Sequence, residues 1–484
     1  MGIENRYFPI GLGYLAARLR DQGHEVLIYS VDTSKSVHPP AYNRMHDYYK
    51  VYIQWVNDFS HPVWQEIRSF LEQFKPEAIG ITAMTPKIAS VLRTASWCKR
   101  YSPQARVIVG GPHATIRPDE LLQWEDVDFV IRGEGEFSLG ELIDACQKGN
   151  PRLLNALEGL SFRKNGGIFH NPPRSLEEDL DALPFPAREL LVYPENFSSE
   201  DLAIIMTSRG CPFQCTFCYK EMFGKRVRFR SIDSVLGEIK EVMKRYKATQ
   251  FAFKDDSFTV NKKRVAELCD RLLEEGIQIH WESTTRVDLI DEPMLQKMAV
   301  AGCNMIKVGV ESGSESIHQL IKKGISLHQV RQAAQWFNRH GIFWVAFFMM
   351  GLPNETEEDI QETRKLMREI QPDYVSIGVY EPYPGTELFD LGTELGLLNP
   401  LMSPSQYFER PPDEYYLKAP PRRVNTMEPQ KFERICEEMT REFDRYNKGI
   451  KRMLKMSLAR RKMYSSDLRS FLKDLRRGLK WLRG

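Results

Sequence analysis

Three cysteines constrain this chain more than any other feature of its sequence. Cys211, Cys215 and Cys218 are spaced as C-x3-C-x2-C, directly after an apolar stretch, 202–206, that predicts a buried strand. Three thiolates this close can bind three irons of a four-iron, four-sulfur cluster, and no fourth cysteine lies nearby for the last iron. A structural zinc site would need four protein ligands, and a disulfide framework would need an even set of cysteines in an exported chain. We therefore predict a cluster with one iron open to another ligand, in preference to zinc or free thiols.

The remaining cysteines indicate a reducing compartment. The chain has 484 residues and 8 cysteines, and those outside the motif show no C-x2-C pairing: Cys98, Cys146, Cys269, Cys303 and Cys436. We expect them to be core residues, with no second cluster. The sequence starts without the basic and apolar regions of a signal peptide, and its longest apolar run, 343–352, is too short to span a bilayer. The expected location is the cytoplasm.

Strand and helix signals alternate through residues 1–150. Short parallel strands are predicted at 26–31, 78–82, 106–109 and 127–131, with amphipathic helices between them. This order is typical of an open, doubly wound, Rossmann-like α/β sheet. Residues 151–195 are predicted to be a linker that contains a hairpin, 159–172, with its turn at 165–167.

The same alternation resumes in a second domain, predicted for residues 196–400. Its strands are expected at 203–206, 250–254, 278–284, 305–310, 343–350 and 374–379. Six strands separated by helices predict a partial (β/α)6 barrel of the TIM type, whose chemistry lies at the C-terminal strand ends. The cysteine loop follows the first of these strands, so it lies where that rule places a reactive group.

Residues 401–484 are predicted to be a helical extension. Its last part, 450–484, is rich in Lys and Arg, which alternate with Leu, Met, Phe and Trp, and holds only two acidic residues, Asp467 and Asp474. Basic amphipathic helices of this kind can lie on anionic membranes. The alternative is a solvated helix packed on the barrel. A peripheral contact with the inner face of the membrane is therefore one expectation for this segment.

The order of these elements resembles the cobalamin-dependent (class B) radical S-adenosylmethionine (SAM) family. The resemblance covers about residues 7–400 and rests on the cysteine motif and on four further segments: 8–16 (FPIGLGYLA), 109–113 (VGGPH), 132–136 (RGEGE) and 183–186 (LPFP). It implies a cobalamin-binding domain, 1–150, followed by a radical SAM core whose open iron takes the amino and carboxylate groups of SAM. It implies cobalamin contacts at Gly11, Thr82, Thr85, Gly110, Gly111, His113, Gly133 and Gly135.

Two departures from the family pattern are visible. No histidine stands in a D-x-H-x-x-G motif, so cobalt is expected to have no protein histidine beneath it. The family usually opens with a strand before the segment at Pro9, and only eight residues precede Pro9 here. A rival reading takes Gly11, Gly13 and Ala16 as a loose dinucleotide fingerprint, but that fingerprint also needs a preceding strand.

The resemblance also assigns the SAM site to the ends of the barrel strands. Its expected members are Phe217, Tyr219, Asp255, Asp256, Arg286, Glu311, Ser312 and Gly351. Two of these assignments have structural alternatives, because Asp255 and Asp256 could cap the next helix and Arg286 could form an ion pair. Arg209 is expected to place a positive charge near the cluster and to favour its reduced form. The turn at 380–386 is expected to face the domain interface.

The function predicted from these observations is methylation of an unactivated carbon. In the resembled family, cleaved SAM gives a 5′-deoxyadenosyl radical that abstracts a substrate hydrogen, and methylcobalamin supplies the methyl group. The alternatives are cyclisation or oxidative rearrangement with the same cofactors, or a non-enzymatic cobalamin sensor. Expected partners are a small-molecule or lipid substrate and an electron donor such as flavodoxin or ferredoxin. No nucleic-acid recognition module is visible.

Overall fold

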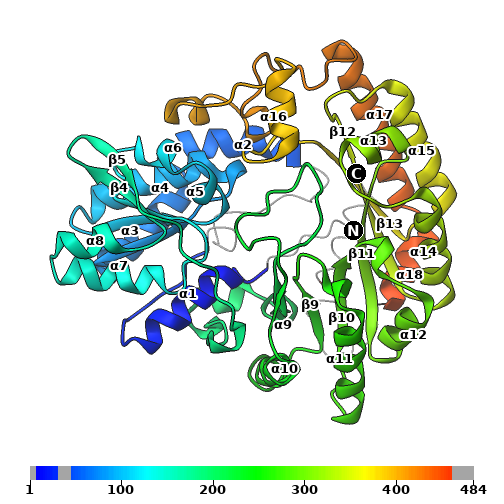
Figure 1. The fold of residues 1–484 in the computed structure, drawn as a ribbon, viewed down its shortest axis with the longest axis horizontal. Coiled ribbons are helices and arrows are strands. Elements are labelled where there is room, and N and C mark those ends of the chain that lie inside the picture. Colours follow the sequence, from blue (N-terminus) through cyan, green and yellow to red (C-terminus); the bar gives the residue numbers. More distant parts are fainter. Residues whose placement is uncertain (1–6, 31–44, 460–471, 473–484) are drawn as a thin grey trace.

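The computed structural model describes residues 7–30, 45–459 and 472, and they form two α/β domains joined by a linker (Figure 1). The first domain lies on one side of the molecule and the barrel on the other. A C-terminal segment runs between them at one edge (Figure 1). The predicted fold class is therefore confirmed.

The first domain is built on a five-stranded sheet. Its strands lie side by side in the order β1 (Ala78–Thr82), β2 (Arg106–Gly110), β3 (Phe129–Ile131), β4 (Leu160–Lys164) and β5 (Gly167–His170). The pairs β1–β2 and β2–β3 are parallel, whereas β3–β4 and β4–β5 are antiparallel. The predicted hairpin is thus present and extends this sheet. Asn165 and Gly166 at its turn have φ of 52° and 79°, the left-handed values that a two-residue hairpin turn requires.

The predicted strand at 26–31 is wrong over its described residues, 26–30. Ile28 forms only an isolated parallel bridge, with Leu191 of the linker. Its carbonyl accepts from Val192 N (3.0 Å), and its side chain is buried beside Phe8 rather than against the sheet. The apolar segment around Ile28 therefore pairs with the linker instead of adding a strand to the sheet, and β1 is the edge strand.

Helices cover the sheet of the first domain. They are α1 (Ile10–Asp21), α2 (Met45–Asn57), α3 (Pro62–Phe74), α4 (Ile88–Tyr101), α5 (Pro112–Ile116), α6 (Pro118–Leu122), α7 (Ser138–Gln147) and α8 (Pro151–Ala156). Trp64 of α3 and Leu92 of α4 are buried against Val107 of β2. This packing fixes the strands whose carboxyl ends carry the predicted cobalamin residues.

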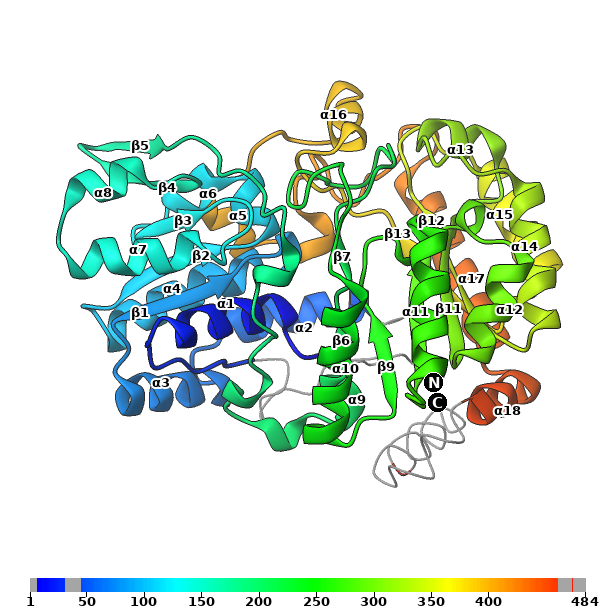
Figure 2. The same ribbon diagram turned by 60° about the horizontal axis from the view of Figure 1, so that its bottom comes forward.

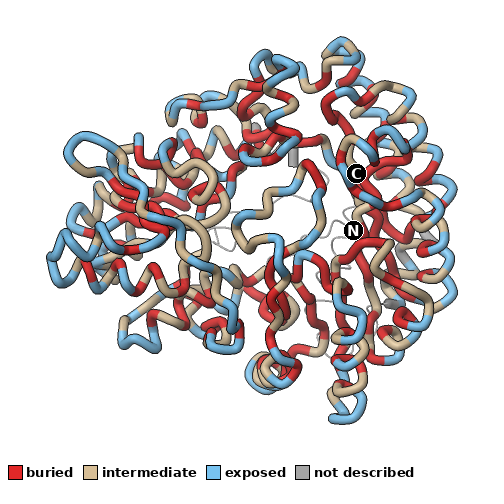
Figure 3. The backbone as a smooth tube through the Cα atoms, in the orientation of Figure 1, coloured by how far each residue is buried: buried red, intermediate tan, exposed pale blue. Residues whose placement is uncertain are grey.

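The second domain is a partial barrel of six parallel strands. The sheet order is β13 (Tyr374–Val379), β12 (Phe343–Met350), β11 (Cys303–Glu311), β10 (His280–Thr285), β9 (Gln250–Phe253) and β6 (Ile204–Ile205). All six predicted strands are present, and each neighbouring pair is parallel. The strands form the buried inner layer in Figure 3. Two further short strands, β7 (Ser208–Arg209) and β8 (Arg228–Phe229), pair with each other beside the cysteine loop.

The outer face of the barrel is covered by helices. They are α9 (Ser199–Leu202), α10 (Ile232–Tyr246), α11 (Lys262–Glu274), α12 (Glu292–Val300), α13 (Glu315–Leu320), α14 (Leu327–Arg339) and α15 (Glu357–Ile370). Alternate strand residues such as Trp281, Ile306 and Trp344 form the core beneath these helices. The residues between them face the other way, into the barrel.

The C-terminal segment returns to the first domain before it closes against the barrel. After α16 (Glu387–Glu394), Tyr407, Tyr415 and Tyr416 are buried in the core of the first domain. Then α17 (Pro429–Asn447) packs on β13, where the Asn447 side chain accepts from Val375 N (2.9 Å) and donates to Val375 O (2.7 Å). The chain thus crosses between the domains three times, once through the linker and then out and back through this segment.

The last described helix is α18 (Ile450–Ala459). The rest of the predicted basic helices, beyond residue 459, lies outside the described residues except for residue 472. Within the described ranges, no helix combines the length and the apolar content that crossing a bilayer requires.

Candidate functional site

The cysteine loop projects from the barrel into the space between the two domains. It follows β7, which Figure 2 shows between the first domain and the strands of the barrel. Gly210 begins the loop with φ of 100°, and a side chain there would collide with the carbonyl oxygen of Arg226. Only glycine fits this conformation and this close approach.

Backbone hydrogen bonds hold the loop at both ends. Cys211 N donates to Gly224 O (3.3 Å) and Cys218 N donates to Cys215 O (3.2 Å). Thr216 N donates to Ile321 O (3.0 Å), beyond the fourth barrel strand, and Thr216 O accepts from Leu388 N (2.9 Å) of α16. The loop is therefore tied to the C-terminal ends of several strands, as the barrel rule predicts.

The three cysteines differ in exposure. Cys215 is buried, Cys211 is half-buried and Cys218 is exposed. Among the described residues, no three His, Cys, Asp or Glu side chains converge as the ligands of one metal ion would. A four-iron cluster does not require that convergence, because each thiolate binds a different iron. Burial raises the pKa of the Cys211 thiol, so this cysteine stays protonated until a metal compensates the charge. The donor set therefore fits the predicted cluster.

Arg286 lies against the cysteine loop. Its Nη1 donates to Cys215 Sγ (3.6 Å), and its guanidinium stacks 3.8 Å from the centre of the Phe213 ring. Its Nε and Nη2 contact Asp288 at 2.9 and 3.0 Å, and Nη2 also donates to Lys323 O (2.5 Å). All three nitrogens are thus engaged by the protein. The ion pair that was one of its two predicted roles is present, and Arg286 also contacts a cluster ligand. Its contact with the SAM carboxylate stays a prediction.

Asp255 and Asp256 anchor the start of the loop. Asp255 is buried and accepts from Thr207 N (2.6 Å) and Ser208 Oγ (2.9 Å), while Asp256 accepts from Gly210 N (3.1 Å). Burial raises the pKa of both carboxyls. The helix-cap alternative is wrong, because Asn261 caps α11 through its side chain. The two aspartates fix the loop instead.

Glu311 and Ser312 end the fourth barrel strand. Glu311 has φ of 69° and forms a buried ion pair with Lys323 (2.8 Å). The Lys323 ammonium also lies 5.8 Å from the centre of the Phe217 ring, within the cysteine motif. The Ser312 hydroxyl is occupied by Thr363 Oγ1 (3.0 Å) and by Ser314 N (3.1 Å), so it fastens the strand end to α15. Glu311 faces the loop, and Ser312 faces the helix layer.

The turn at Gly351 is set by a buried carboxyl group. Gly351 has φ of 84°, and a Cβ there would lie 2.7 Å from Phe432 Cζ. Glu355 Oε2 accepts from Gly351 N (2.5 Å) and Leu352 N (3.2 Å), and burial raises the pKa of Glu355 to about 8. Glu355 therefore holds this turn as a neutral acid at pH 7.

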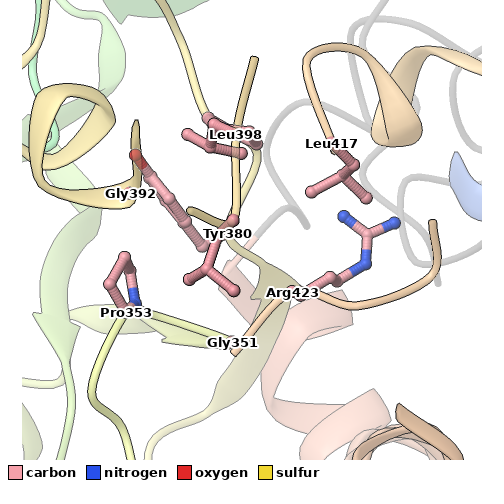
Figure 4. A pocket seen from close by; sticks show the side chains of 9 residues that line it. Gly351, Pro353, Tyr380, Gly392, Leu398, Leu417 and Arg423 are labelled. Atoms are coloured by element: carbon pink, nitrogen blue, oxygen red, sulfur yellow. The ribbon is translucent and has the colours of Figure 1, made fainter. Parts of the chain in front are cut away.

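The C-terminal segment seals the side of the Gly351 turn. Figure 4 shows Gly351 and Tyr380 facing Leu398, Leu417 and Arg423 across a small pocket. The cavity measures about 10 Å³, which is room for about one water molecule. A larger groove, of about 440 Å³, lies on the outer helices around Glu358 and Arg331. None of the predicted site residues lines it, although Gly313 and Ser314, which follow Ser312, do.

Phe217 of the cysteine loop contacts the barrel, and Tyr219 lies at the interface with the first domain. Phe217 packs against an apolar cluster that contains Ile321 and Tyr380 at the top of the barrel. A Cβ on Gly385 would lie 3.1 Å from the Tyr219 ring and 3.1 Å from Ile116 Cγ2 of the first domain. The predicted position of the 380–386 turn at the domain interface is therefore confirmed.

Most predicted cobalamin residues gather at the carboxyl ends of β1, β2 and β3. Thr82 pairs with Gly110 in register, and Gly133 N donates to Thr115 Oγ1 (2.9 Å). Gly111 has φ of 100°, and a Cβ there would lie 3.0 Å from Thr82 Oγ1. The protein's own backbone thus requires that glycine. Gly133 has φ of 77° and no atom near a Cβ position, which leaves open space for a ligand.

Two other glycines lie outside this group. Gly11 is exposed on α1, with no atom near a Cβ position, and it is Gly13 that has a steric role: a Cβ there would lie 2.5 Å from the Phe8 ring. On Gly135, a Cβ would lie 3.2 Å from Leu15 Cδ2, so that glycine allows close packing against α1.

The side chains of His113 and Thr85 are buried inside the first domain and are not open to a ligand. Both are buried, with His113 Nδ1 3.1 Å from Thr85 Oγ1 and His113 Nε2 3.5 Å from Glu120 Oε2. Glu120 also accepts from the hydroxyls of Tyr407 and Tyr416. Burial lowers the pKa of His113, so its imidazole is neutral. These side chains join the C-terminal segment to the first domain, and a contact with cobalamin would have to use their backbone.

A buried set of ion pairs across the domain interface was missed by the sequence analysis. Arg209 Nη1 contacts Glu134 Oε1 (2.8 Å) and its Nη2 contacts Glu136 Oε1 (2.6 Å), while Arg228 Nη1 contacts Glu134 Oε2 (2.9 Å). The two carboxylates balance the charge of Arg209, which weakens the predicted effect of this positive charge on the cluster. The RGEGE segment contains the two carboxylates, Glu134 and Glu136. Local spacing could not show that Arg209, 75 residues after Glu134, would be their partner.

A second missed group lies inside the barrel. Lys307 contacts Glu282 Oε1 (2.5 Å), and Lys254 lies 3.9 Å from the same oxygen and 3.6 Å from the centre of the Tyr7 ring. Burial and the neighbouring Lys307 lower the pKa of Lys254 to about 8. These residues alternate with core positions along β9–β11, a sign that charged side chains face the barrel interior.

The fold and this site define a cobalamin-dependent radical SAM protein. The B12 binding domain model matches residues 2–143, and the Radical SAM superfamily model matches residues 205–367. The chain belongs to the cobalamin-dependent radical SAM family, and its cofactors are a [4Fe-4S] cluster, SAM and cobalamin.

The chain is similar in sequence to a methyltransferase and a cyclase, and in fold to a radical SAM methyltransferase. An uncharacterized methyltransferase of Pyrococcus horikoshii is 32% identical over 81% of this chain and 79% of that protein. The anaerobic magnesium-protoporphyrin IX monomethyl ester cyclase of Rubrivivax gelatinosus is 29% identical over 72% of this chain and 65% of that protein. In fold, the chain is similar to the radical SAM methyltransferase TsrM of Kitasatospora setae, with a TM-score of 0.64 and 17% identity over 84% of this chain and 79% of that one.

The Arg286–Cys215 contact predicts an effect on the cluster. Replacing Arg286 by Met removes a positive charge and an N–H···S contact, both of which favour the reduced, more negative cluster. The midpoint potential should therefore shift to more negative values in a redox titration followed by electron paramagnetic resonance. R286K, which keeps the charge, should shift it less. An unchanged potential in R286M would show that the contact has no electrostatic role.

Glu355 predicts a defined pH dependence of stability. Its pKa is about 8 in the folded protein against an ordinary value of 4.5, so the folded state binds this proton more tightly. Its contribution is full below pH 4.5 and falls by about 1.4 kcal/mol for each pH unit as the pH rises towards 8. The difference in free energy of unfolding between wild type and E355Q, measured by urea denaturation, should change across this window. A constant difference would contradict the assignment.

Proposed function

We propose that this protein is a methyltransferase that acts on an unactivated carbon. The observation that carries the proposal is the meeting of the cysteine loop with the cobalamin-binding domain, where Gly385 packs between Tyr219 and Ile116. When bound, the cofactors supply a carbon-centred radical and a transferable methyl group. The protein has to hold both within reach of one substrate, and this interface is where it can do so.

The chain's own residues position and shield that interface. Cys211, Cys215 and Cys218 hold the cluster, and Arg286 orients the loop through its contact with Cys215. The Glu311–Lys323 ion pair gives the adjacent wall a fixed polar surface. The C-terminal segment covers the side of the barrel next to Gly351 and so limits the access of solvent to the proposed site.

Several relatives support methyl transfer. Besides the protein of Pyrococcus horikoshii, they include a cytidylyl-2-hydroxyethylphosphonate methyltransferase of Streptomyces wedmorensis, 25% identical over 81% of this chain and 79% of that protein. A hopanoid C-3 methylase of Methylococcus capsulatus is 26% identical over 79% of this chain and 68% of that protein. Because one relative is a cyclase, ring closure without methyl transfer is the second candidate function.

A labelled methyl donor tests the proposal. The anaerobically reconstituted protein is incubated with reductant, cobalamin and SAM whose methyl group carries deuterium, in a small-molecule and lipid extract. We expect a product that carries the labelled methyl group, formed together with methionine and 5′-deoxyadenosine. The C215A variant, which lacks a cluster ligand, should form no deoxyadenosine.

The outcomes separate the two candidates. Deoxyadenosine together with an unlabelled product that has lost hydrogen would support cyclisation and overturn methyl transfer. Labelled product without deoxyadenosine would leave methyl transfer but exclude the radical route.

We further propose that the protein works in the cytoplasm with an electron donor of the flavodoxin or ferredoxin type, and that its C-terminus contacts the inner face of the membrane. Leu454 and Leu458 of α18 are each 59% exposed, one turn apart. On an adjacent side of the helix, Lys455 forms an ion pair with Asp373 at 2.6 Å. Two exposed leucines among basic residues suit a weakly bound membrane surface helix.

Liposome sedimentation checks the membrane contact. Binding to vesicles with anionic lipid should be weak and should fall as salt screens the basic residues. Deleting residues 450–484 should abolish it, and L454E together with L458E should reduce it strongly. The exposed L401E variant, at a site with 65% exposure in wild type, is the matched control. Equal binding after the deletion would remove the proposal.

A further inference from the structure

Two glutamates of the cobalamin-binding domain reach the start of the cysteine loop. Glu134 and Glu136 contact Arg209 at 2.8 and 2.6 Å, and Arg209 is the residue before Gly210, which opens the loop. Side-chain exposure in these pairs is 4% for Arg209, 8% for Glu134 and 9% for Glu136. The contact is therefore almost closed to solvent.

Aromatic rings around Arg209 confine its guanidinium to the position where it meets the two glutamates. Its guanidinium lies 5.1 Å from the centre of the Tyr14 ring and 5.2 Å from that of Phe223, so aromatic rings flank it. A buried guanidinium that loses a carboxylate partner keeps an uncompensated charge, which is far more costly than losing an exposed pair. Arg209, and with it the backbone of the loop, is expected to shift if Glu136 is neutralised.

The same glutamates are linked to the neighbouring backbone. Arg228 contacts Glu134 Oε2 (2.9 Å), and its Nη2 donates to Phe223 O (3.2 Å). Phe223 precedes Gly224, whose carbonyl accepts from Cys211 N (3.3 Å). Glu134 thus acts on both sides of the loop, through Arg209 before the cysteines and through Arg228 after them.

The glutamates alternate with the glycines that were expected to face cobalamin. Gly133 has open space at its Cβ position, and Glu134 beside it is directed at the two arginines. A ligand resting on Gly133 would restrict the backbone that carries Glu134. One short segment therefore borders the expected cobalamin position and the cysteine loop at once.

We propose that Glu134 and Glu136 are positioning residues of the cluster loop, and that cobalamin bound beside Gly133 orders the loop through them. The proposal rests on the cobalamin site assumed in the proposed function and goes beyond it. It assigns to the first domain a direct part in placing the cluster ligands. By linkage, an ordered loop should in turn favour cobalamin binding.

Hydrogen–deuterium exchange of the full-length, cluster-free protein tests this. The loop peptide 207–224 is compared in wild type, E136Q and the double variant E134Q with E136Q, each with and without hydroxocobalamin. We expect E136Q to speed loop exchange by ~10-fold, as for loss of coupling within a buried ion network. Hydroxocobalamin should slow loop exchange in wild type and should have no effect on it in the double variant.

The control has the same chemistry away from the loop. Arg423 and Asp413 form an ion pair at 2.8 Å with 10% and 8% side-chain exposure, so D413N removes a comparably buried charge. Loop exchange should stay at the wild-type rate in D413N. A loop that responds to D413N as strongly as to E136Q would overturn the proposal, because the effect would then be one of general stability.

Two further results would also overturn it. One is equal loop exchange in wild type and E136Q, and the other is cobalamin protection that persists in the double variant. If the double variant exchanges rapidly throughout the chain, loop exchange is measured in E136D instead. Aspartate keeps the carboxylate but has a side chain shorter by one methylene group. Intermediate loop exchange in E136D supports the proposal, and wild-type exchange contradicts it. Because no turnover is measured, failure of the methyl-transfer assay leaves this result standing.

Discussion

The arrangement of the whole protein depends on buried charges at the interface between its domains. Arg209 and Arg228 on one side and Glu134 and Glu136 on the other are removed from water and satisfy one another. Removing charges from water is expensive, so such a set is stable only when every partner is in place. This requirement fixes the distance between the cobalamin-binding domain and the cysteine loop more tightly than apolar packing could, because apolar contacts tolerate sliding and paired charges do not.

The C-terminal segment adds a second connection of different character. Tyr407 and Tyr416 enter the core of the first domain and donate to Glu120, whose carboxylate also faces His113. On its own, burial would raise the pKa of Glu120, but the hydrogen bonds from His113 and the tyrosines outweigh it and keep the pKa below its ordinary value. The same segment borders the Gly351 turn of the barrel. A single stretch of chain thereby links both domains and covers the side of the barrel next to the Gly351 turn.

Sequence reasoning placed the residues of the barrel side at strand ends, where the structure also has them, whereas Thr85 and His113 of the cobalamin side are buried in contacts of their own. The positions of the cysteine loop, Glu311 and Gly351 at strand ends follow from the alternation of strands and helices, which is a local property. Asp255, Asp256 and Arg286 were placed correctly in the chain, yet their side chains act on the loop, because a carboxylate or guanidinium takes whichever partner the fold presents. The expected strand at 26–31 failed for a related reason: an apolar pattern shows that a segment is buried but not which partner it pairs with.

By itself, the sequence determined the chemistry and the order of the parts: three thiolates with an open iron, two α/β domains, and glycines where the backbone must turn or approach closely. Those features are encoded by residue type and local spacing. The tertiary structure alone decided which charges meet, with Arg209 on Glu134 and Glu136, Arg286 on Asp288 and Cys215, and His113 on Glu120. The reason is physical: the pairing of buried charges depends on distances across the folded chain, and residues far apart in sequence carry no local signal of the partner that burial will give them.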